Sequence, residues 1–544
     1  MKLCADGLKD GGWEKLGVRL PRFDYKAVSA GTIEKPIWIH YGAGNIFRGF
    51  IASLQQRLID GGYSDKGIIA AEGFDHEIID RIYAPHDNLS LLVGLRPDGS
   101  TDKSVIGSIA GAYKTDSEGK AELERMFCEP GLQIFSFAIT EKGYSLVDFD
   151  GNPLPGVTED FENPPHMAKY SICAATALLY KRYEAGAMPL AVLCLDNFSG
   201  NGDRLKAAVM AVAEGWRGKG VIDGGFIDYL NDRDKISFPW TMIDKITPRP
   251  SEKICRRLED AGLLLEPIVT GKGTYIAPYV NAEIPQYLVV EDDFPNGRPC
   301  LEEAGVYFAG RETVNKAERM KVTACLNPLH TALAIFGRLL GFDSIAEEMG
   351  DEDLRRLVEC IGYAECLPVV EDPGIIDPRE FLKEVLTQRL PNPFMPDTPQ
   401  RVASDTSQKM PIRFGETIKA YAAREDLGCE KLVCIPLTIA AWFRYLLGLD
   451  DRLEQMRLSD DPLMDRLREA VSGIEAARAD SYNGQLTPLL SDSRLFGMDL
   501  YEAGIGGRVE RLFVEMLRGR GAVRRILHNI LGGAACDDIR SRAT

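Results

Sequence analysis

PIWIHYGAGNIFRGF (36–50) is the stretch that decides the fold of this 544-residue chain. A short β-rich run, residues 36–41, leads directly into the glycines Gly42 and Gly44. Apolar residues then recur with helical spacing as far as Leu58, and a second apolar strand, GIIAAE (67–72), ends at Glu72. The order of strand, glycine turn, helix, strand and acid is that of a βαβ unit that binds a nucleotide.

The glycine turn has the physical properties of a diphosphate site. Gly42 permits a tight exit from the strand, Gly44 lets a diphosphate approach the backbone, and the next helix offers free N–H groups. The third glycine of the usual G-x-G-x-x-G pattern is replaced by Phe47, and Glu72 lies about 30 residues after the first glycine instead of about 20. The turn alone therefore fits an ordinary βα connection as well as a dinucleotide site. Glu72 could accept from ribose hydroxyls and disfavour a 2′-phosphate, which favours NAD; Asp75 is the rival acid, and a solvated loop carboxylate is the plain alternative.

The remaining pattern predicts two domains. Further β-rich runs at 91–93, 132–140 and 190–195 indicate an open, mostly parallel sheet over roughly the first 300 residues. Helical periodicity then takes over, at 323–340, 352–366, 378–389, 412–423 and 432–447. We predict an α/β protein with a Rossmann-type, doubly wound sheet domain and its extensions over 1–302, followed by a mainly α-helical domain over 303–544.

Composition limits the classes of function. The chain has 81 acidic and 64 basic residues and a net charge of −17, which argues against nucleic-acid binding and against an anionic membrane surface. Twelve cysteines without zinc-ligand spacing are expected to be reduced thiols, so no metal site is predicted. The N-terminus lacks a signal-peptide core, and the longest apolar run, 432–443, is too short to cross a membrane. We expect a cytoplasmic protein that is a monomer or a weak homodimer.

One lysine, one asparagine and one histidine lie close together in ERMKVTACLNPLH (318–330), at Lys321, Asn327 and His330. A buried lysine amine can act as an acid/base near neutral pH, and an asparagine amide can donate to a developing alkoxide. A histidine can hold a substrate hydroxyl or relay a proton. On a regular helix of about 100° per residue, however, Lys321 and His330 fall on opposite faces. Either the trio is accidental or the backbone is distorted between its members.

Six segments, in order along the chain, resemble the polyol-specific long-chain dehydrogenases, the family of mannitol dehydrogenases and hexuronate reductases. They are GAGNIFRGF (42–50), ITEKGY (139–144), CLDNFSGNG (194–202), FPWTMIDKITP (238–248), EIPQYLVVEDDFPNGRP (283–299) and RVASDTSQKMPIRF (401–414). The resemblance spans residues 38–449. It implies an active site between a Rossmann-type and a helical domain, and hydride transfer between NAD and a sugar-derived alcohol or ketone without zinc. It further implies that the first domain binds NAD and that the second holds the substrate-binding and catalytic residues.

The resemblance also implies roles for single residues. Lys321 would be the acid/base, and Asn327 together with Asn197 would polarise the substrate carbonyl as an oxyanion hole. His330 would bind a substrate hydroxyl, and Glu141 would connect the proton of the lysine to solvent. The cofactor would lie on Gly42, Gly44, Asn45, Ile46 and Glu72.

The predicted substrate is a small sugar acid or polyol. Arg401 and Lys409 match the family's substrate-binding pair, and an arginine can bind a carboxylate with two hydrogen bonds. Ser404 stands where some family members have a histidine, which favours the hexuronate branch, the fructuronate reductases. The implied reaction interconverts D-fructuronate and D-mannonate. Tagaturonate/altronate and mannitol/fructose interconversion are the alternatives, and a non-catalytic NAD or sugar-acid sensor is the alternative of another class.

One departure from the family pattern makes a structural prediction. The segment from Lys321 to Asn327 is one residue longer than in the family, whose shorter spacing leaves lysine and histidine within about 80° on a helix. A π-bulge or a break can absorb one extra residue, and Pro328 cannot donate a main-chain hydrogen bond. We therefore predict a distorted helix between Val322 and Pro328.

Overall fold

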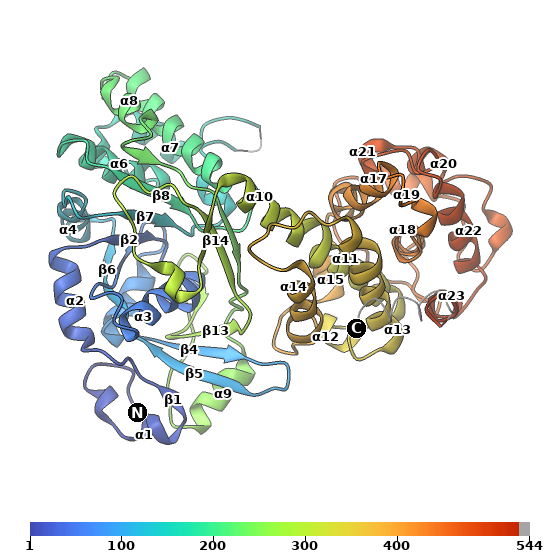
Figure 1. Ribbon diagram of the computed structural model, residues 1–544, viewed down its shortest axis with the longest axis horizontal. Helices are drawn as coiled ribbons and strands as arrows, with labels where there is room; N and C mark the ends of the chain where they lie inside the picture. Colours follow the sequence, from blue (N-terminus) through green and yellow to red (C-terminus); the bar gives the residue numbers. More distant parts are fainter. Residues whose placement is uncertain (149, 533–544) are drawn as a thin grey trace. The chain divides into compact units, whose positions relative to one another are not determined.

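The computed structural model describes residues 1–148 and 150–532 (Figure 1). The chain forms two compact units: unit 1 comprises residues 1–96 and 100–315, and the described part of unit 2 comprises residues 97–99 and 316–532. The division falls inside helix α10 (Arg311–Arg319), later in the chain than the expected boundary at 302/303. Unit 1 is α/β and unit 2 is helical, so the predicted fold class is confirmed.

The main element of unit 1 is a six-stranded sheet in which all neighbouring strands are parallel. Its order is β6-β3-β2-β7-β8-β9. The chain runs outward from β2 to β6 on one side and from β7 to β9 on the other, so the direction reverses between β2 and β7. Doubly wound sheets bind ligands at the carboxyl end of such a reversal. The strands are β2 (Trp38–Tyr41), β3 (Ile68–Glu72), β6 (Ile109–Lys114), β7 (Ile134–Phe137), β8 (Leu190–Cys194) and β9 (Ile236–Ser237).

Both faces of this sheet are buried, because successive side chains along a strand point to opposite sides. Tyr41 and Phe135 belong to the core of one face, together with residues of α4, α6 and α7. Trp38 and Ile134 belong to the core of the other face, together with residues of η2 and α3. These helices are α4 (Ser117–Phe127), α6 (Ser171–Glu184), α7 (Asn201–Gly218), the π-helix η2 (Phe47–Ile51) and α3 (Ala52–Asp60).

The strand predicted at 91–93 is present as β4 (Ser90–Leu95), but the prediction that it joins the main sheet is wrong. It pairs antiparallel with β5 (Thr101–Ile106) across the tight turn RPDGS (96–100), in a separate sheet of order β1-β5-β4-β13. A parallel neighbour would need a crossover of a dozen or more residues, which this turn does not provide. The other strands are β1 (Val18–Arg19), β13 (Tyr279–Glu283), β10 (Thr241–Asp244), β14 (Tyr287–Glu291), β15 (Tyr307–Ala309), β11 (Ile268–Val269) and β12 (Tyr275–Ile276).

Unit 2 contains the predicted helices, several of which change between α and π geometry. The central helix is α18 (Cys434–Leu446), whose thirteen residues are all buried. The helices that precede α18 in unit 2 include α11 (Asn327–Leu340), α13 (Glu352–Glu359), η9 (Cys360–Cys366), α14 (Pro378–Glu384), η11 (Val385–Arg389), α15 (Pro399–Val402), α16 (Thr406–Met410), η12 (Pro411–Gly415) and α17 (Glu416–Ala422). Shorter or more distal helices are α12 (Ile345–Glu348), α19 (Met464–Ala470), α22 (Gly506–Met516) and α23 (Ala522–Leu531).

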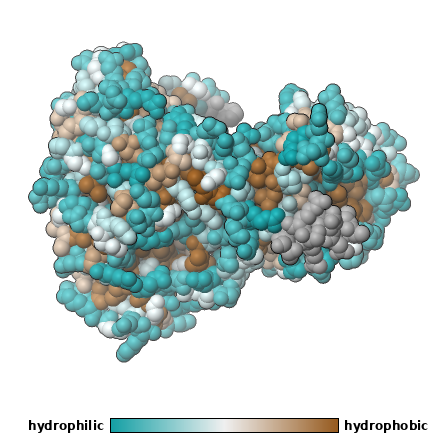
Figure 2. Space-filling model, in the orientation of Figure 1, coloured by the Kyte–Doolittle hydropathy of each residue, from teal (hydrophilic) through white to brown (hydrophobic). Residues whose placement is uncertain are grey.

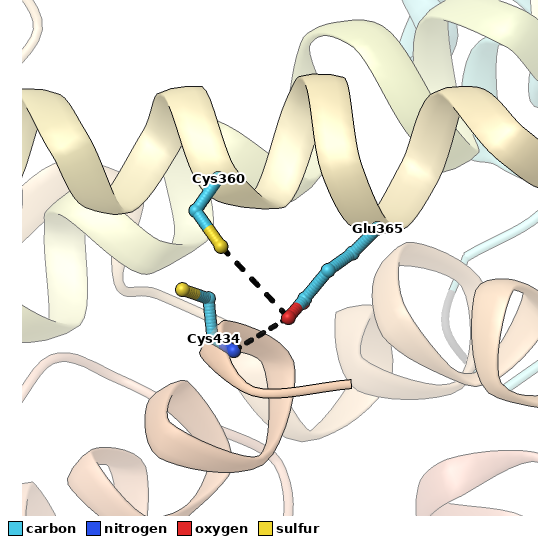
Figure 3. Close-up of side chains that lie close together, drawn as sticks. All are labelled: Cys360, Glu365 and Cys434. Carbon is cyan, nitrogen blue, oxygen red and sulfur yellow. Dashed lines mark hydrogen bonds between the residues drawn. The ribbon is translucent and has the colours of Figure 1, made fainter. Parts of the chain in front are cut away.

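A buried glutamate of another helix caps the N-terminus of α18 (Figure 3). The Glu365 carboxylate of η9 accepts from the N–H groups of Val433, Cys434 and Ile435 at 2.5–2.8 Å. Burial raises the pKa of Glu365 to about 7, against the lowering effect of these N–H groups. The Cys360 and Cys434 thiols lie within 4.8 Å of its oxygens, but both oxygens already serve the helix end. We therefore assign this group a structural role.

On the face drawn in Figure 2, hydrophilic residues predominate and hydrophobic residues form small separate groups. No helix among the described residues combines the length and the apolar character that crossing a membrane requires. The cysteines of residues 1–148 and 150–532 are all free thiols.

Candidate cofactor and substrate sites

The residues predicted from unit 1 gather at one edge of the main sheet. Gly42 follows β2, Glu72 ends β3, Glu141 follows β7 and Asn197 follows β8. Because β3, β2, β7 and β8 are parallel neighbours in that order, their carboxyl ends share an edge. Gly42 lies at the reversal point, directly after β2. Its φ is +108°, and a Cβ there would lie 2.3 Å from the carbonyl oxygen of Ala138, just after β7. Only glycine fits this position.

Hydrogen bonds hold the glycine turn on all sides. Glu72 accepts from the N–H of Ala43 at 2.8 Å, and its other oxygen accepts from Phe74 and Asp75. The Tyr83 hydroxyl donates to the carbonyl of Ala43 at 2.9 Å. The carboxylate expected to receive a ribose therefore already organises the turn, with its remaining lone pairs left for a ligand.

The turn fits the diphosphate of a dinucleotide. A Cβ added to Gly44 would meet no atom within 4 Å, so open space faces the backbone at this point. Asn45 and Ile46 begin the helix that continues through η2 and α3, and helix N-termini bind anions through free N–H groups. The rival acid, Asp75, is buried and accepts from the hydroxyls of Thr270 and Thr274 at 2.6 Å each. Of the two acids, Glu72 is therefore the one joined directly to the turn.

Asp196 joins the ends of β7 and β8. Its carboxylate accepts from the N–H groups of Ile139 and Thr140 and from the Tyr144 hydroxyl, at 2.6–3.1 Å. Thr140 has a φ of +66°, which is strained for a β-branched residue and is maintained by these bonds. Burial raises the pKa of Asp196.

The two predicted residues beside this junction are exposed. Asn197 follows Asp196 directly, at the exposed end of β8. Glu141 is 59% exposed and forms an ion pair with Arg204. The predicted proton relay would therefore use a carboxylate that is exposed to solvent in unit 1.

The helix between Lys321 and His330 is irregular, as the sequence predicts. A π-helix, η8 (Met320–Cys325), ends at Leu326, whose φ and ψ of −130° and −62° are not helical, and α11 begins at Asn327. The N–H of Leu326 bonds to the carbonyl of Lys321, five residues earlier, at 3.1 Å. A turn of this width can absorb one extra residue, as the longer spacing between Lys321 and Asn327 requires. Lys321 is buried, with 2% of its surface exposed.

The positive charges of several side chains of unit 2 act on His330. Burial is the largest cause lowering the pKa of His330 to about 3, followed by the charges of Arg413, Arg401, Arg389 and Lys409. Asp397 Oδ2 lies 3.6 Å from His330 Nε2, too far for a hydrogen bond, and Asp397 also pairs with Arg401. His330 is therefore a neutral imidazole that can hold a hydroxyl by donating or accepting.

The predicted substrate pair belongs to this cluster. Arg401 is exposed and bonded to Asp397. Lys409 donates to the carbonyls of Val402 and Ser404, and burial followed by the charge of Arg413 lowers its pKa to about 8. In unit 2 the structure thus brings His330, Arg401 and Lys409 together.

Arg413 connects the cluster to Asn327. It donates to the Thr331 hydroxyl at 2.6 Å and to the Asn327 carbonyl at 3.4 Å. Both acceptors lie within the first five residues of α11, so the arginine is bonded to the end of the helix that carries the predicted catalytic asparagine.

Comparison with known proteins identifies the family. Residues 36–303 match the mannitol dehydrogenase Rossmann domain, and residues 313–506 match the mannitol dehydrogenase C-terminal domain. The chain is 52% identical to a D-mannonate oxidoreductase of Thermotoga maritima, over 98% of this chain and 99% of the relative. The chain belongs to the mannitol dehydrogenase family.

Other members of this family agree in sequence and fold. The D-mannonate oxidoreductase of Escherichia coli is 26% identical, over 89% of this chain and 92% of the relative. The structure of Pseudomonas fluorescens mannitol 2-dehydrogenase with NAD and D-mannitol is 26% identical and covers 98% of this chain and 100% of its own, with a TM-score of 0.67. A D-sorbitol dehydrogenase structure, at 22% identity and a TM-score of 0.73, shares the fold over 92% and 94% of the two chains. As a member of this dehydrogenase family, the chain is an oxidoreductase with a Rossmann domain, as predicted.

Sequence reasoning missed several residues of this mannitol dehydrogenase fold. Asp397, four residues before Arg401, has the i,i+4 spacing of an ion pair, which was a usable signal. Arg413 lies inside the segment 401–414, which resembles the family, and a charge beside apolar residues was the available clue. Arg389 carries no such signal, because only the packing of η11 places it near His330.

Proposed function

We propose that this protein is an NAD-dependent oxidoreductase that interconverts D-fructuronate and D-mannonate. The observation that carries the substrate class is the group of cations near His330. Arg401 shares Asp397 with His330, Arg413 binds Thr331 of the same helix, and the charges of both arginines also act on Lys409. Cations that lie close together and partly buried repel one another, and an anionic ligand relieves that repulsion. A sugar carboxylate does so and a neutral polyol does not. The similarity to the Thermotoga maritima D-mannonate oxidoreductase supports the same substrate.

NAD supplies the chemistry of hydride transfer when it is bound, and the fit of the glycine turn supports its place on Gly42, Gly44, Asn45 and Ile46. In reduction, the keto carbon of D-fructuronate gains the hydride, and Lys321 Nζ gives its proton to the carbonyl oxygen. In oxidation, Lys321 Nζ receives the hydroxyl proton. Burial of Lys321 excludes water from this transfer.

The other predicted residues hold the substrate. Asn327 and Asn197 donate to the carbonyl oxygen, where negative charge develops. His330 binds a hydroxyl, and Arg401 and Lys409 bind the carboxylate. Glu141 returns the proton of the lysine to solvent.

The test is the oxidation of NADH with D-fructuronate, D-tagaturonate and D-fructose as substrates, repeated with NADPH and after dialysis against a chelator. We expect the highest kcat/KM with D-fructuronate and NADH, and the same turnover after chelation, because Lys321 is the proposed acid/base. A preference for D-tagaturonate would assign the protein to tagaturonate/altronate interconversion, within the same hexuronate branch. Preference for D-fructose would overturn the role of the cation cluster.

Two further expectations belong to this proposal. An acidic chain whose described cysteines are all thiols suits the reducing cytoplasm. We also propose a monomer or weak homodimer, which light scattering at several protein concentrations would test.

A further inference from the structure

Arg48 is a buried arginine directly behind the glycine turn. It lies on η2, is 1% exposed, and donates through Nη1 to the Ala277 carbonyl at 2.8 Å and to the Ser90 hydroxyl at 3.1 Å. Nη2 donates to Asn45 Oδ1 at 2.8 Å, and Nε has no hydrogen-bond partner among the described residues. The guanidinium also lies 5.9 Å from the ring centroid of Tyr83.

None of these partners, within the described chain, is a carboxylate. A buried guanidinium without an opposite charge is costly, and burial lowers the pKa of Arg48 accordingly. Glu72, the carboxylate of the turn, gives its oxygens to the N–H groups of Ala43, Phe74 and Asp75 instead. The described part of the protein therefore gives the buried guanidinium of Arg48 no bonded carboxylate that would balance its charge.

We infer that Arg48 is a positioning residue for the cofactor, which fixes Asn45 and places a buried positive charge behind the site of the diphosphate. This inference rests on the proposed use of NAD. Two features of the turn converge on it: Arg48 holds the Asn45 side chain, and Tyr83, over which it lies, holds the Ala43 carbonyl. The diphosphate provides the negative charge that the buried guanidinium lacks, in a site where screening by water is weak.

Arg182 offers a matched control. It is also a fully buried arginine of unit 1, on α6, and it donates to the main-chain carbonyls of Phe127, Glu129, Leu132, Met188 and Pro189 at 2.8–3.1 Å. Arg182→Lys should affect thermal stability and leave the ligand affinities of the folded protein unchanged. Ser90→Ala removes one bond of Arg48 without removing its charge, so it should change affinity less than twofold.

The experiment measures the affinities of NADH, ADP-ribose and adenosine for wild type, Arg48→Met and Arg48→Lys by titration calorimetry. We expect Arg48→Met to weaken NADH and ADP-ribose about 10- to 100-fold and adenosine less than threefold, because only the first two carry the diphosphate. Arg48→Lys, which keeps the charge, should recover part of the loss and remain usable if the methionine variant does not fold.

Three outcomes would overturn the inference. They are an unchanged NADH affinity in Arg48→Met (or in Arg48→Lys, if the methionine variant does not fold), an equal loss for adenosine and NADH, or the same loss in Arg182→Lys. A wild-type protein that binds none of the three ligands would instead contradict the proposed use of NAD, so the two failures are distinguishable.

Discussion

The glycine turn of unit 1 and the His330 cluster of unit 2 handle charge in opposite ways. Around the turn, the polar groups of Ala43, Glu72 and Tyr83 bond to one another, so its shape exists before any ligand arrives. Around His330, the charges of Arg413, Arg401, Arg389 and Lys409 all oppose its protonation, and Asp397, the carboxylate 3.6 Å away, already binds Arg401. In the proposed function, the first region binds the dinucleotide through a preformed shape and main-chain donors, with Arg48 behind it, and the second binds the substrate through exposed or half-buried cations. This difference fits what each region is proposed to recognise: a dinucleotide common to many enzymes, and one particular small substrate.

The largest expected effect is the fall in kcat when Lys321 is replaced, a residue outside both the glycine turn and the His330 cluster. Lys321→Ala should lower kcat by about 10²- to 10⁴-fold, the usual contribution of an acid/base group, and leave NADH affinity within about twofold. Stopped-flow measurement of NADH oxidation and a fluorescence titration would check the two parts. Lys383→Ala, an exposed lysine of the same unit paired with Glu380, is the matched control and should keep wild-type turnover. Unchanged turnover in Lys321→Ala would remove this residue from the mechanism.

The next effect separates the two modes directly. Arg401→Met should raise KM for D-mannonate about 10- to 100-fold, since a hydrogen bond to a charged group contributes about 1.5–3 kcal/mol. Its kcat and the NADH affinity should change only a few-fold. Steady-state kinetics with both substrates varied would show this division. Arg424→Met, an exposed arginine of unit 2 paired with Asp426, should leave KM unchanged; an equal increase there would mean that overall charge, and not the cluster, attracts the substrate.

The sequence predicts a different part of each region. The βαβ unit follows from apolar periodicity and two glycines, and the irregular helix follows from a conflict of register between Lys321 and His330. Both are properties of neighbouring residues. The sheet that β4 joins and the position of Arg389 depend on contacts between distant segments, which spacing does not contain. The burial of the Arg48 side chain could not be predicted either, because a helical pattern assigns a residue to a face of the helix but does not identify the partners of its side chain.

A smaller effect is the pH dependence of stability caused by Glu365, a carboxylate that, like Glu72, accepts hydrogen bonds from main-chain N–H groups. The folded-state pKa of Glu365, about 7, is above the ordinary value of 4.5, so the fold favours its protonated form. Its contribution to the free energy of unfolding is therefore present below about pH 4.5 and is lost as the pH rises to about 7, by roughly 3 kcal/mol at most.

Thermal unfolding at pH 5, 6, 7 and 8 checks this with Glu365→Gln, which cannot titrate. The difference in melting temperature between wild type and variant should shift against the wild type as the pH rises through this range. Glu380→Gln, at an exposed glutamate, should show no such trend. A constant difference for Glu365→Gln would mean that the carboxylate does not titrate there.

The smallest effect contrasts two histidines with a lowered pKa, the buried His40 of unit 1 and the partly buried His330 of unit 2. His40 and His330 both have a pKa lowered to about 3, but burial alone lowers the pKa of His40, whereas the four cations add to burial at His330. His40 stacks on Phe47 and bonds to Ser136 within the core. Nitrogen NMR of the imidazoles should therefore find both neutral between pH 5 and 8.

Removing one cation should separate them. In Arg401→Met the pKa of His330 should rise, because a positive charge is lost and Asp397 loses its partner, while the pKa of His40 stays where it is. A rise confined to His330 would show that charge governs the substrate region. An unchanged His330 would show that burial alone keeps it neutral, and the contrast between the two regions would then lose its electrostatic basis.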